Sequence, residues 1–378
     1  MAENGGSRKP ADTAFRQQRL PAWQPILTPN AVIGFFLAIG TLFLILGIVI
    51  QQASDSIVEK IVQYDGSGTN SAQSDCKLSN GGDCQITFTA PEKMEAPIYV
   101  YYQIDNFYQN HRKYVASYNE DQLLGEVYTD ESDVESCSPL YKNDTSLLSP
   151  CGVIANSLFN DKITLAGSSV DGLKLKTTNI AWPSDKDKKF AQPSGFKSKS
   201  ASCSEVSDCI GSYCTDEVCT SLGLKSNCKG YNCSDPDYYN CEKGCYATYY
   251  PSDDEVQYLY ETFPEVVSPM LGVKDEHFIV WMRVAALPTF RKLYGRIMDD
   301  IPKGGTVTFD VDAEFWVNKF KGKKYLIITT ASFVGGKNSF LYIAYLVVGS
   351  FCLAAALAFA IKIAVVGPRK LGDTSLLE

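Results

Sequence analysis

The sequence predicts a membrane protein with two transmembrane α-helices and, between them, a large disulfide-stabilised domain rich in β-strands. Three observations predict this fold class. Two runs of twenty or more apolar residues lie near the two ends of the 378-residue chain. The 289 residues between the runs, 51–339, hold twelve of the thirteen cysteines, and short stretches of β-branched and aromatic residues recur there. A region of that size is long enough for one large domain or two small ones.

Each apolar run is long enough to cross a bilayer as a helix. Residues 31–50 carry no charge, and Thr41 is the only polar side chain among them. At about 1.5 Å rise per residue, such a helix spans roughly 30 Å, the thickness of a bilayer's hydrocarbon core. Residues 340–361 form a second uncharged run. The first run is too long for the apolar core of a signal peptide and no A-x-A-type site follows it, so we expect an uncleaved anchor.

Charge at the flanks predicts the orientation of the chain. The formal net charge is −8; residues 1–30 carry +2 and residues 362–378 carry +1, which leaves −11 for the region between the runs. The positive-inside rule places both basic tails in the cytoplasm, and an even number of spans agrees. Residues 51–339 would then form a luminal or extracellular domain. Its acidity excludes nucleic acid as a partner, because that would require a basic stripe.

The cysteines agree with a position outside the cytoplasm. Twelve is an even number, as a disulfide framework in an oxidising compartment requires. Cys76 and Cys84 bracket a turn at Asn80-Gly81-Gly82, which predicts a local hairpin disulfide. Eight more fall within residues 203–245, namely Cys203, Cys209, Cys214, Cys219, Cys228, Cys233, Cys241 and Cys245. Zinc is the rival interpretation, but there is no C-x2-C pair and no nearby histidine, so we expect a disulfide-stapled insertion whose pairing stays open.

Five segments of the central region have the pattern of β-strands. Residues 85–89 and 307–311 alternate between apolar and polar residues, and residues 98–104 and 325–330 are rich in β-branched and aromatic residues. Both patterns are typical of strands. Residues 278–284 are almost entirely apolar, which predicts a buried strand.

Two further segments have helical spacing. The apolar side of the first is formed by Phe107, His111, Tyr114 and Val115, and Asp105 or Asn106 is its predicted cap. The apolar side of the second is formed by Phe290, Leu293, Tyr294 and Ile297, after Pro288 in the first turn. A histidine on the apolar side of a short helix is usually a hydrogen-bonded structural residue, so we do not expect His111 to be catalytic.

Small residues form stripes in both predicted spans. The second run carries Gly349, Cys352, Ala356 and Ala360 on one helical face, and the first run carries Gly40 and Gly47. Small faces let transmembrane helices approach closely. We therefore expect helix partners in the bilayer, either each other or a larger membrane protein.

The central region offers glycosylation sites but no catalytic motif. Its two sequons begin at Asn143 and Asn232. The two histidines, His111 and His277, are far apart, and no H-E-x-x-H, G-x-S-x-G, Walker-type or D-K-T-G motif occurs. We therefore expect no enzyme activity, cofactor or bound metal.

Five blocks of the chain, in order, resemble the CDC50/LEM3 family. They are TAFRQQRLPAWQPILTP at 13–29, IYVYYQIDNFYQNHRKYVASYNEDQL at 98–123, PCGVIANSLFND at 150–161, a weaker match at 180–190, and IVWMRVAALPTFRKLYG at 279–295. Gly335-Gly336-Lys337-Asn338 then enters the second run as in the family, whereas residues 203–245 depart from it. Members are the two-span accessory (β) subunits of P4-type ATPases, the lipid flippases.

The resemblance implies a mostly antiparallel α+β domain, with short helices, clamped over the extracytoplasmic loops of a P4-ATPase. It implies a disulfide between Cys137 and Cys151. It also implies a heterodimer in which this chain is non-catalytic. The pump would need it for folding, for exit from the endoplasmic reticulum and for moving phospholipids to the cytoplasmic leaflet. The resident membrane would be that of the endoplasmic reticulum, Golgi, endosome or plasma membrane.

We expect contacts with the pump on both sides of the membrane. The cytoplasmic candidates are Phe15, Arg16, Arg19 and Trp23, although the arginines could instead reach acidic lipid, and the whole arm could simply be a basic stop before an anchor. The candidates in the central region are Asn106, Phe107, His111, Arg112, Phe290, Arg291 and Tyr294. These last residues are either contact or core residues.

Two rival functions are considered. A two-span receptor or adhesion protein would use the Cys-rich insertion as its ligand site, but a single span and a plain tail would suffice for that. A membrane-anchored enzyme would need a catalytic constellation that the motifs do not supply.

Overall fold

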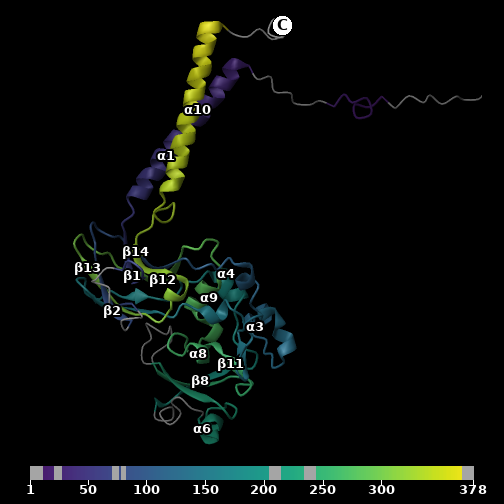
Figure 1. The fold of residues 1–378 in the computed structure, drawn as a ribbon, viewed down its shortest axis with the longest axis vertical. Coiled ribbons are helices and arrows are strands. Elements are labelled where there is room, and N and C mark those ends of the chain that lie inside the picture. The colour runs from purple at the N-terminus through teal and green to yellow at the C-terminus, as the bar shows by residue number, and fades with distance from the viewer. Residues whose placement is uncertain are drawn as a thin grey trace, which may run out of the picture. The chain divides into compact units, whose positions relative to one another are not determined.

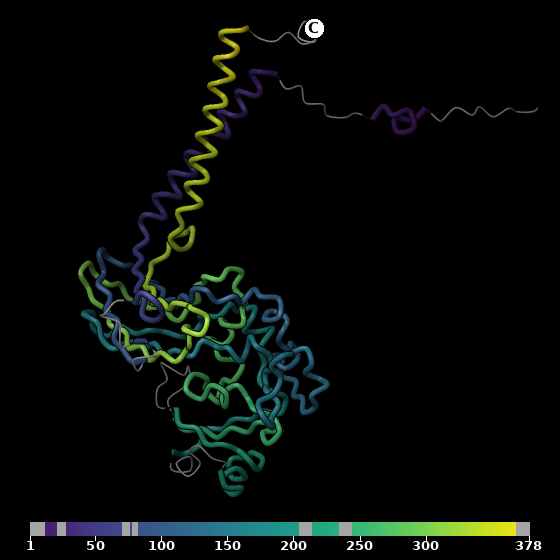
Figure 2. Tube along the Cα trace, in the orientation of Figure 1, coloured from purple at the N-terminus to yellow at the C-terminus, as the bar shows by residue number. Residues whose placement is uncertain are grey.

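In a computed structural model the protein divides into two units (Figure 1). One contains the two long terminal helices, within Met1–Ser54 and Asn338–Glu378; the other, which we call the central domain, is Asp55–Lys337. The structure describes residues 12–20, 28–69, 76–77, 82–203, 214–233 and 244–367. Figure 2 traces the chain through these residues.

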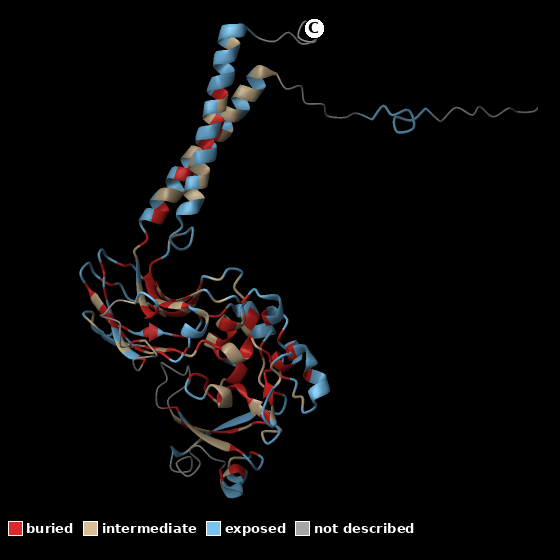
Figure 3. Ribbon diagram, viewed as in Figure 1, coloured by how far each residue is buried: buried red, intermediate tan, exposed pale blue. Residues whose placement is uncertain are grey.

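Helices α1 (Pro29–Asp55) and α10 (Ser339–Val366) contain the two predicted spans and extend beyond the apolar runs. Both are long and apolar enough to cross a bilayer. They pack against each other through small residues, and their buried positions include Gly40, Gly47, Gly349, Cys352 and Ala356 (Figure 3). A Cβ added to Gly349 would lie 3.0 Å from the Gly40 carbonyl oxygen. The helices therefore meet each other, one of the two predicted alternatives, while Ala360 is exposed.

Two antiparallel sheets form the centre of the central domain. The larger has strand order β1-β14-β3-β12-β7 and the smaller β2-β13-β6. Their strands are β1 (Glu59–Gly66), β2 (Asp83–Thr89), β3 (Ile98–Asp105), β6 (Lys162–Ser168), β7 (Leu175–Lys176), β12 (Phe290–Ile297), β13 (Thr306–Asp312) and β14 (Lys323–Thr329). The alternating and β-branched patterns predicted β2, β3, β13 and β14, and all four are present. The mostly antiparallel topology is also confirmed.

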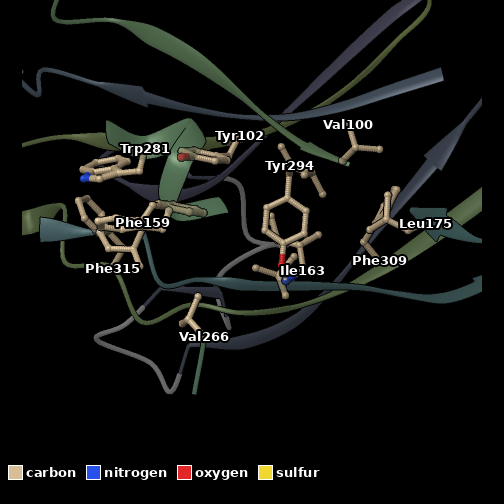
Figure 4. Close-up of a cluster of buried hydrophobic side chains, with 14 of the residues drawn as sticks. Val100, Tyr102, Phe159, Ile163, Leu175, Val266, Trp281, Tyr294, Phe309 and Phe315 are labelled. Carbon is tan, nitrogen blue, oxygen red and sulfur yellow. Dashed lines mark hydrogen bonds between the residues drawn. The ribbon is translucent and has the colours of Figure 1, made fainter. Parts of the chain in front are cut away.

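Both sheets contribute side chains to one buried cluster (Figure 4). The ring of Tyr102 on β3 stacks on Phe159 at 3.8 Å, and Phe309 on β13 meets Phe88 edge to face at 5.8 Å. β3 alternates strictly, with every second residue from Ile98 buried. The period-2 pattern of a strand thus directs every second side chain of β3 into the core.

The prediction for residues 278–297 is wrong in both halves, because helix and strand are exchanged. Residues 278–284, predicted as a strand, lie mostly within helix α9 (Glu276–Met282). Asp275 caps this helix, since its carboxylate accepts from the His277 and Phe278 amides at 2.8 and 3.1 Å. The helix is apolar around most of its surface because it is buried, so its sequence carries no clear period.

The second half, predicted as a helix, is strand β12. Its register shifts between Leu293 and Gly295, where Tyr294 is inserted as a β-bulge against β3. A bulge reverses the alternation of side chains. Buried apolar side chains therefore fall at Phe290, Tyr294 and Ile297, spacings of four and three that imitate a helix.

The helix predicted around Phe107 is shorter and starts later than expected. Helix α2 spans only Arg112–Val115, with His111 at the N-cap position and no side-chain cap. Asn106, predicted as a cap, instead adopts a left-handed backbone with φ of 61°. The chain therefore turns at Asn106 and sends Phe107 into the core before any helix forms.

Short elements complete the central domain. The helices and 3₁₀ turns are α3 (Glu120–Leu123), η3 (Glu131–Cys137), η4 (Ala155–Ser157), α4 (Pro183–Lys188), α6 (Asp216–Ser221), α8 (Leu259–Thr262), η5 (Gly272–Lys274) and η6 (Asn318–Phe320). Two three-stranded sheets are formed by β4 (Lys142–Asn143), β5 (Ser146–Ser149) and β11 (Val256–Tyr258), and by β8 (Lys197–Ala201), β9 (Lys229–Cys233) and β10 (Gly244–Tyr249).

Disulfides connect the predicted cysteines. The pairs in the described residues are Cys76–Cys84, Cys137–Cys151, Cys203–Cys245 and Cys219–Cys228. The first is the predicted hairpin disulfide, and the second is the pair that the family resemblance implied. Cys214 and Cys233 are also disulfide-bonded, whereas Cys209 and Cys241 lie outside the described residues.

Candidate partner interface

The N-terminal arm presents its predicted contact residues to solvent. Residues 14–18 form a turn, in which the Arg16 amide donates to Thr13 Oγ1 at 3.2 Å. Phe15 is 76% exposed, and the Arg19 guanidinium forms an ion pair with Asp12. The turn thus displays an aromatic ring beside two guanidinium groups. Trp23, the fourth predicted contact, lies outside the described residues.

The loop after β3 is tied to the segment that leads into β12. The Phe107 amide donates to the Pro288 carbonyl at 3.0 Å, and Asn110 Nδ2 donates to the Ala286 carbonyl at 2.8 Å. Gln109 is fully buried, and its Oε1 accepts from the Ala285 amide at 2.9 Å. These bonds run between stretches almost 180 residues apart in sequence. They hold two of the family-like blocks in one rigid unit.

The predicted contact residues of this region separate into core and surface. Phe107 packs among aromatic rings, of which Phe320 and Trp281 are 5.2 and 5.8 Å away between centroids. Phe290 and Tyr294 are buried, and the Tyr294 hydroxyl accepts from the Ile163 amide at 2.9 Å. Phe290 and Tyr294 therefore belong to the core, as one of the two predicted alternatives.

The other predicted contact residues lie at the surface. Asn106 is exposed, yet its amide donates to the Phe320 carbonyl at 2.6 Å. His111 and Arg112 are exposed at the start of α2. Arg291 is 37% exposed on its side chain and forms an ion pair with Glu59 at 2.6 Å. His111 and Arg112 are therefore available to a partner, whereas the partly exposed Arg291 guanidinium is held by Glu59 and Gln103.

A buried ammonium group joins α9 to β12. Lys292 Nζ donates to the carbonyls of Val280 and Trp281 at 3.0 Å each, and to that of Arg283. Burial, with the nearby charge of Arg283, lowers the pKa of Lys292 to about 7. Because the last carbonyls of a helix otherwise lack partners, this side chain terminates α9 and fixes its end against the sheet.

A cationic hollow of about 590 Å³ lies beside this joint. We define it by Tyr99, Tyr101, Trp182, Arg283, Arg291 and Arg296. Its lining includes these three arginines, the buried Lys292, whose pKa is lowered to about 7, and a single carboxylate, Asp185. In a region of net charge −11, such a concentration of positive charge is a local exception.

The side chains of the hollow are held in place by their neighbours. Arg283 donates to Asp185 at 2.5 Å and lies 5.3 Å from the centre of the exposed Trp182 ring. The Arg283 hydrogen bond holds the pKa of Asp185 below its usual value, although burial opposes this. Arg296 donates to the carbonyls of Thr178 and Asn179 at 3.2 and 2.7 Å. The hollow is therefore a preorganised surface that suits a partner of negative charge.

Sequence reasoning identified only Arg291 among these cations. Arg283 and Arg296 come from α9's end and from β12, where helix and strand were exchanged, and Trp182 precedes α4. With β12 recognised as a strand, Arg291 and Arg296 fall on the two sides of the Tyr294 bulge. Finding the hollow from the sequence would have required recognition of the β-bulge at Tyr294. The apolar and polar alternation of the sequence does not reveal that bulge.

Both sequon asparagines are exposed. Asn143 is the last residue of β4, before the tight turn to β5, and Asn232 lies on β9. No cluster of three or more His, Cys, Asp and Glu side chains arranged to hold a metal ion occurs in the described part of the chain.

Comparison with known proteins identifies close relatives. The model of the LEM3 (ligand-effect modulator 3) family / CDC50 family matches residues 49–370. ALA-interacting subunit 3 of Arabidopsis thaliana is 36% identical over 385 residues, which cover 100% of this chain and 92% of that protein. Cell cycle control protein 50A of Bos taurus is 36% identical over 91% of this chain and 86% of its own length. Cell cycle control protein 50B of Homo sapiens is 33% identical over 92% of both chains.

Proposed function

Because the chain belongs to the LEM3/CDC50 family, we propose that it is the non-catalytic β-subunit of a P4-type ATPase that moves phospholipids to the cytoplasmic leaflet. The observation that carries this proposal is the family match over residues 49–370, which includes the C-terminal end of α1, the central domain and all of α10. The name of one relative, ALA-interacting subunit 3, is that of a subunit that interacts with another protein. The pump would carry the ATP site and the lipid path.

We propose that this chain contributes folding, exit from the endoplasmic reticulum and stability to its pump. Both tails would lie in the cytoplasm and the central domain in the lumen or outside the cell, with Asn143 and Asn232 glycosylated. The buried joint between α9 and β12 supports this role, since an obligate subunit must offer a rigid surface. The membrane would belong to the secretory pathway or cell surface.

Two surfaces are our candidates for contact with the pump. The first is the arm at Phe15, Arg16 and Arg19, to which we add Trp23 from the sequence. The second is the cationic hollow, to which we add the exposed His111 and Arg112. The hollow would attract acidic extracytoplasmic loops and would repel basic ones, so it would contribute to the choice of partner.

Purification in mild detergent tests the proposal. The tagged chain should retain a large P-type ATPase in equal amount, with ATP hydrolysis that lipid stimulates. A chain that leaves the endoplasmic reticulum and purifies alone, well folded, would overturn the subunit function.

The contribution of the arm is tested by the double substitution Arg16→Ala, Arg19→Ala. The expected result is less complex and lower ATPase activity, because the two guanidinium groups are lost from the exposed turn. Arg8→Ala, Lys9→Ala is the matched control, since it removes the same charge from the same tail. If both variants behave alike, charge near the membrane and not a specific contact is what matters. Unchanged complex yield in the first variant rules out the arm contact.

A further inference from the structure

The two connections between the central domain and the long helices differ in length. The Val58 amide donates to Thr330 Oγ1 at 3.1 Å, and the Thr330 amide donates to the Val58 carbonyl at 3.0 Å. On the helical side, the Asn338 amide donates to Ser54 Oγ at 3.3 Å. Four residue steps separate Ser54 from Val58, whereas eight separate Thr330 from Asn338. The connection to α10 therefore carries four residue steps more than the distance requires.

A closed turn at Ser332–Gly335 takes up this surplus. The amides of Ser332 and Gly335 each donate to the other's carbonyl at 2.9 Å, and the Val334 amide donates to Ser332 Oγ at 3.3 Å. Gly335 has φ of +108°, a conformation that side chains disfavour, so glycine is needed to close the turn. The turn is therefore fixed by its own backbone.

The residues at the tip of this turn are apolar and exposed. Phe333 is 82% exposed and Val334 is 40% exposed. An ordered turn that displays a phenyl ring and an isopropyl group to water is unfavourable unless something covers them. The Ser332 hydroxyl is hydrogen-bonded within the turn, so Phe333 and Val334 are the side chains at its tip.

The length of chain to α10 limits how far the tip can lie from the start of this long apolar helix. Five residue steps separate Phe333 from Asn338, the N-cap of α10, so at roughly 3.6 Å per residue the tip lies no more than about 18 Å from the start of the helix. Lys337 lies between the tip and the helix. A cation beside exposed apolar side chains, next to a transmembrane helix, is the pattern of a membrane-interface anchor, in which the cation reaches lipid phosphate.

We propose that Phe333 and Val334 insert into the headgroup region of the bilayer and anchor the central domain to the lipid surface. The inserted tip makes a second attachment beside α10 and limits how far the domain can tilt. This role is independent of the proposed pump, because the lipid is present around the spans with or without a partner.

Tryptophan fluorescence in nanodiscs tests the proposal on the full chain, alone and with its pump. Phe333→Trp adds one emitter to the four native tryptophans, and the unsubstituted chain supplies the background. Phosphatidylcholine brominated on its acyl chains should quench most of the added emission, while acrylamide in the water should quench little of it. Glu217→Trp, on the exposed surface of α6 in the Cys-rich insertion (residues 203–245, which we call the Cys-rich module), is the matched control and should respond in the opposite way.

Two outcomes would overturn the proposed membrane anchor. If acrylamide quenches the added fluorescence and the brominated lipid does not, the tip lies in water. Added emission that resists both quenchers only when the pump is bound would identify a protein contact instead. If Phe333→Trp disturbs folding, a diazirine-labelled phospholipid crosslinked to the unsubstituted chain replaces it, and crosslinks within residues 331–337 are the supporting result while their absence counts against the anchor.

Discussion

At the scale of single residues, the most constrained group in the central domain is a fully buried lysine. Lys324 Nζ lies 2.7 Å from Asp161 Oδ2 and 3.3 Å from Asp65 Oδ2, and all three side chains are completely excluded from solvent. The Tyr64 hydroxyl donates to the same Asp161 oxygen at 2.7 Å. Lys324 also donates to the Phe315 carbonyl at 2.9 Å. The cluster therefore connects β1, β14 and the segment after β13 through one ammonium group.

Removal of this ammonium should destabilise the domain severely. Lys324→Met keeps the length of the side chain but leaves two buried carboxylates unneutralised, which costs about 3–5 kcal/mol for a broken buried pair. The midpoint of thermal or denaturant unfolding of the full chain in detergent measures this. Lys323→Met, on the opposite face of the same strand and half-buried, is the control and should change little. Equal effects of the two substitutions would contradict the structural role of the cluster.

The cap of α9 should make stability depend on pH. Burial raises the pKa of Asp275 from 3.8 to about 7, against the opposing hydrogen bonds from the Phe278 and His277 amides. Between these values the folded state binds more protons than the unfolded state, so the contribution of Asp275 to stability falls as pH rises from about 4 to about 7.

Asp275→Asn tests this pH dependence, because asparagine keeps a capping oxygen and has no charge to titrate. Unfolding midpoints of the wild type and the variant should diverge as pH rises through that window, with the wild type losing more. Asp187→Asn, on the exposed side of α4, should follow the wild type. Parallel curves for wild type and Asp275→Asn would refute the expected titration.

At the scale of elements, local pattern predicted the strands whose alternation is uninterrupted and failed where a longer-range contact decides. β3 and β13 keep a strict period of two, so their sequences suffice. α9 is a helix because Asp275 caps its start and Lys292 satisfies its last carbonyls, and Lys292 belongs to a different element. β12 was misread because the bulge at Tyr294 changes its period. In both cases the secondary structure depends on contacts with another element of the fold, and the local sequence pattern does not contain them.

The contact between α1 and α10 gives a prediction at the same scale. A Cβ on Gly40 would lie 3.1 Å from the Gly349 carbonyl oxygen and 2.8 Å from the end of the Leu353 side chain. Leucine can move but the backbone oxygen cannot, so Gly40→Ile should force the helices apart. We expect a lower unfolding midpoint in detergent and less mature protein in cells. Gly34→Ile, which has open space around it, should leave both unchanged; a loss in both variants would indicate a general effect on insertion.

At the scale of the whole molecule, the two spans, the disulfide-rich region between them and the family were all accessible from the sequence. The cationic hollow was not, because its side chains come from β3, β12, the end of α9 and the residue before α4. These segments are distant in sequence and meet only when the sheet forms. Hydropathy and motif spacing identify elements, but a surface assembled from several elements depends on their register.

The Cys-rich module is the part of the molecule that distinguishes a subunit from a receptor. Its buried residues Cys214, Cys219, Leu224 and Cys228 form a small core with Ala247 of β10, just outside the module. The Cα atoms of Cys203 and Cys245 are 5.1 Å apart at its base, so a short Gly-Ser link can span the gap that removal of residues 203–245 would leave. Lys229, inside the module, pairs with Asp253 and Glu261 outside it at 2.8 and 2.6 Å.

Deletion of the module should leave the subunit function intact. Asp253→Asn and Glu261→Gln accompany the deletion, because removal of Lys229 would otherwise leave two part-buried carboxylates without this cation. A variant carrying only these two substitutions is the control. We expect the shortened chain to purify with its pump and to leave the endoplasmic reticulum with it, as co-localisation would report, because the arm, both long helices and the cationic hollow all lie outside the deleted residues. A shortened chain that folds but no longer retains the pump would assign the partner interface to the module itself, and would return the receptor-like use of this surface to consideration.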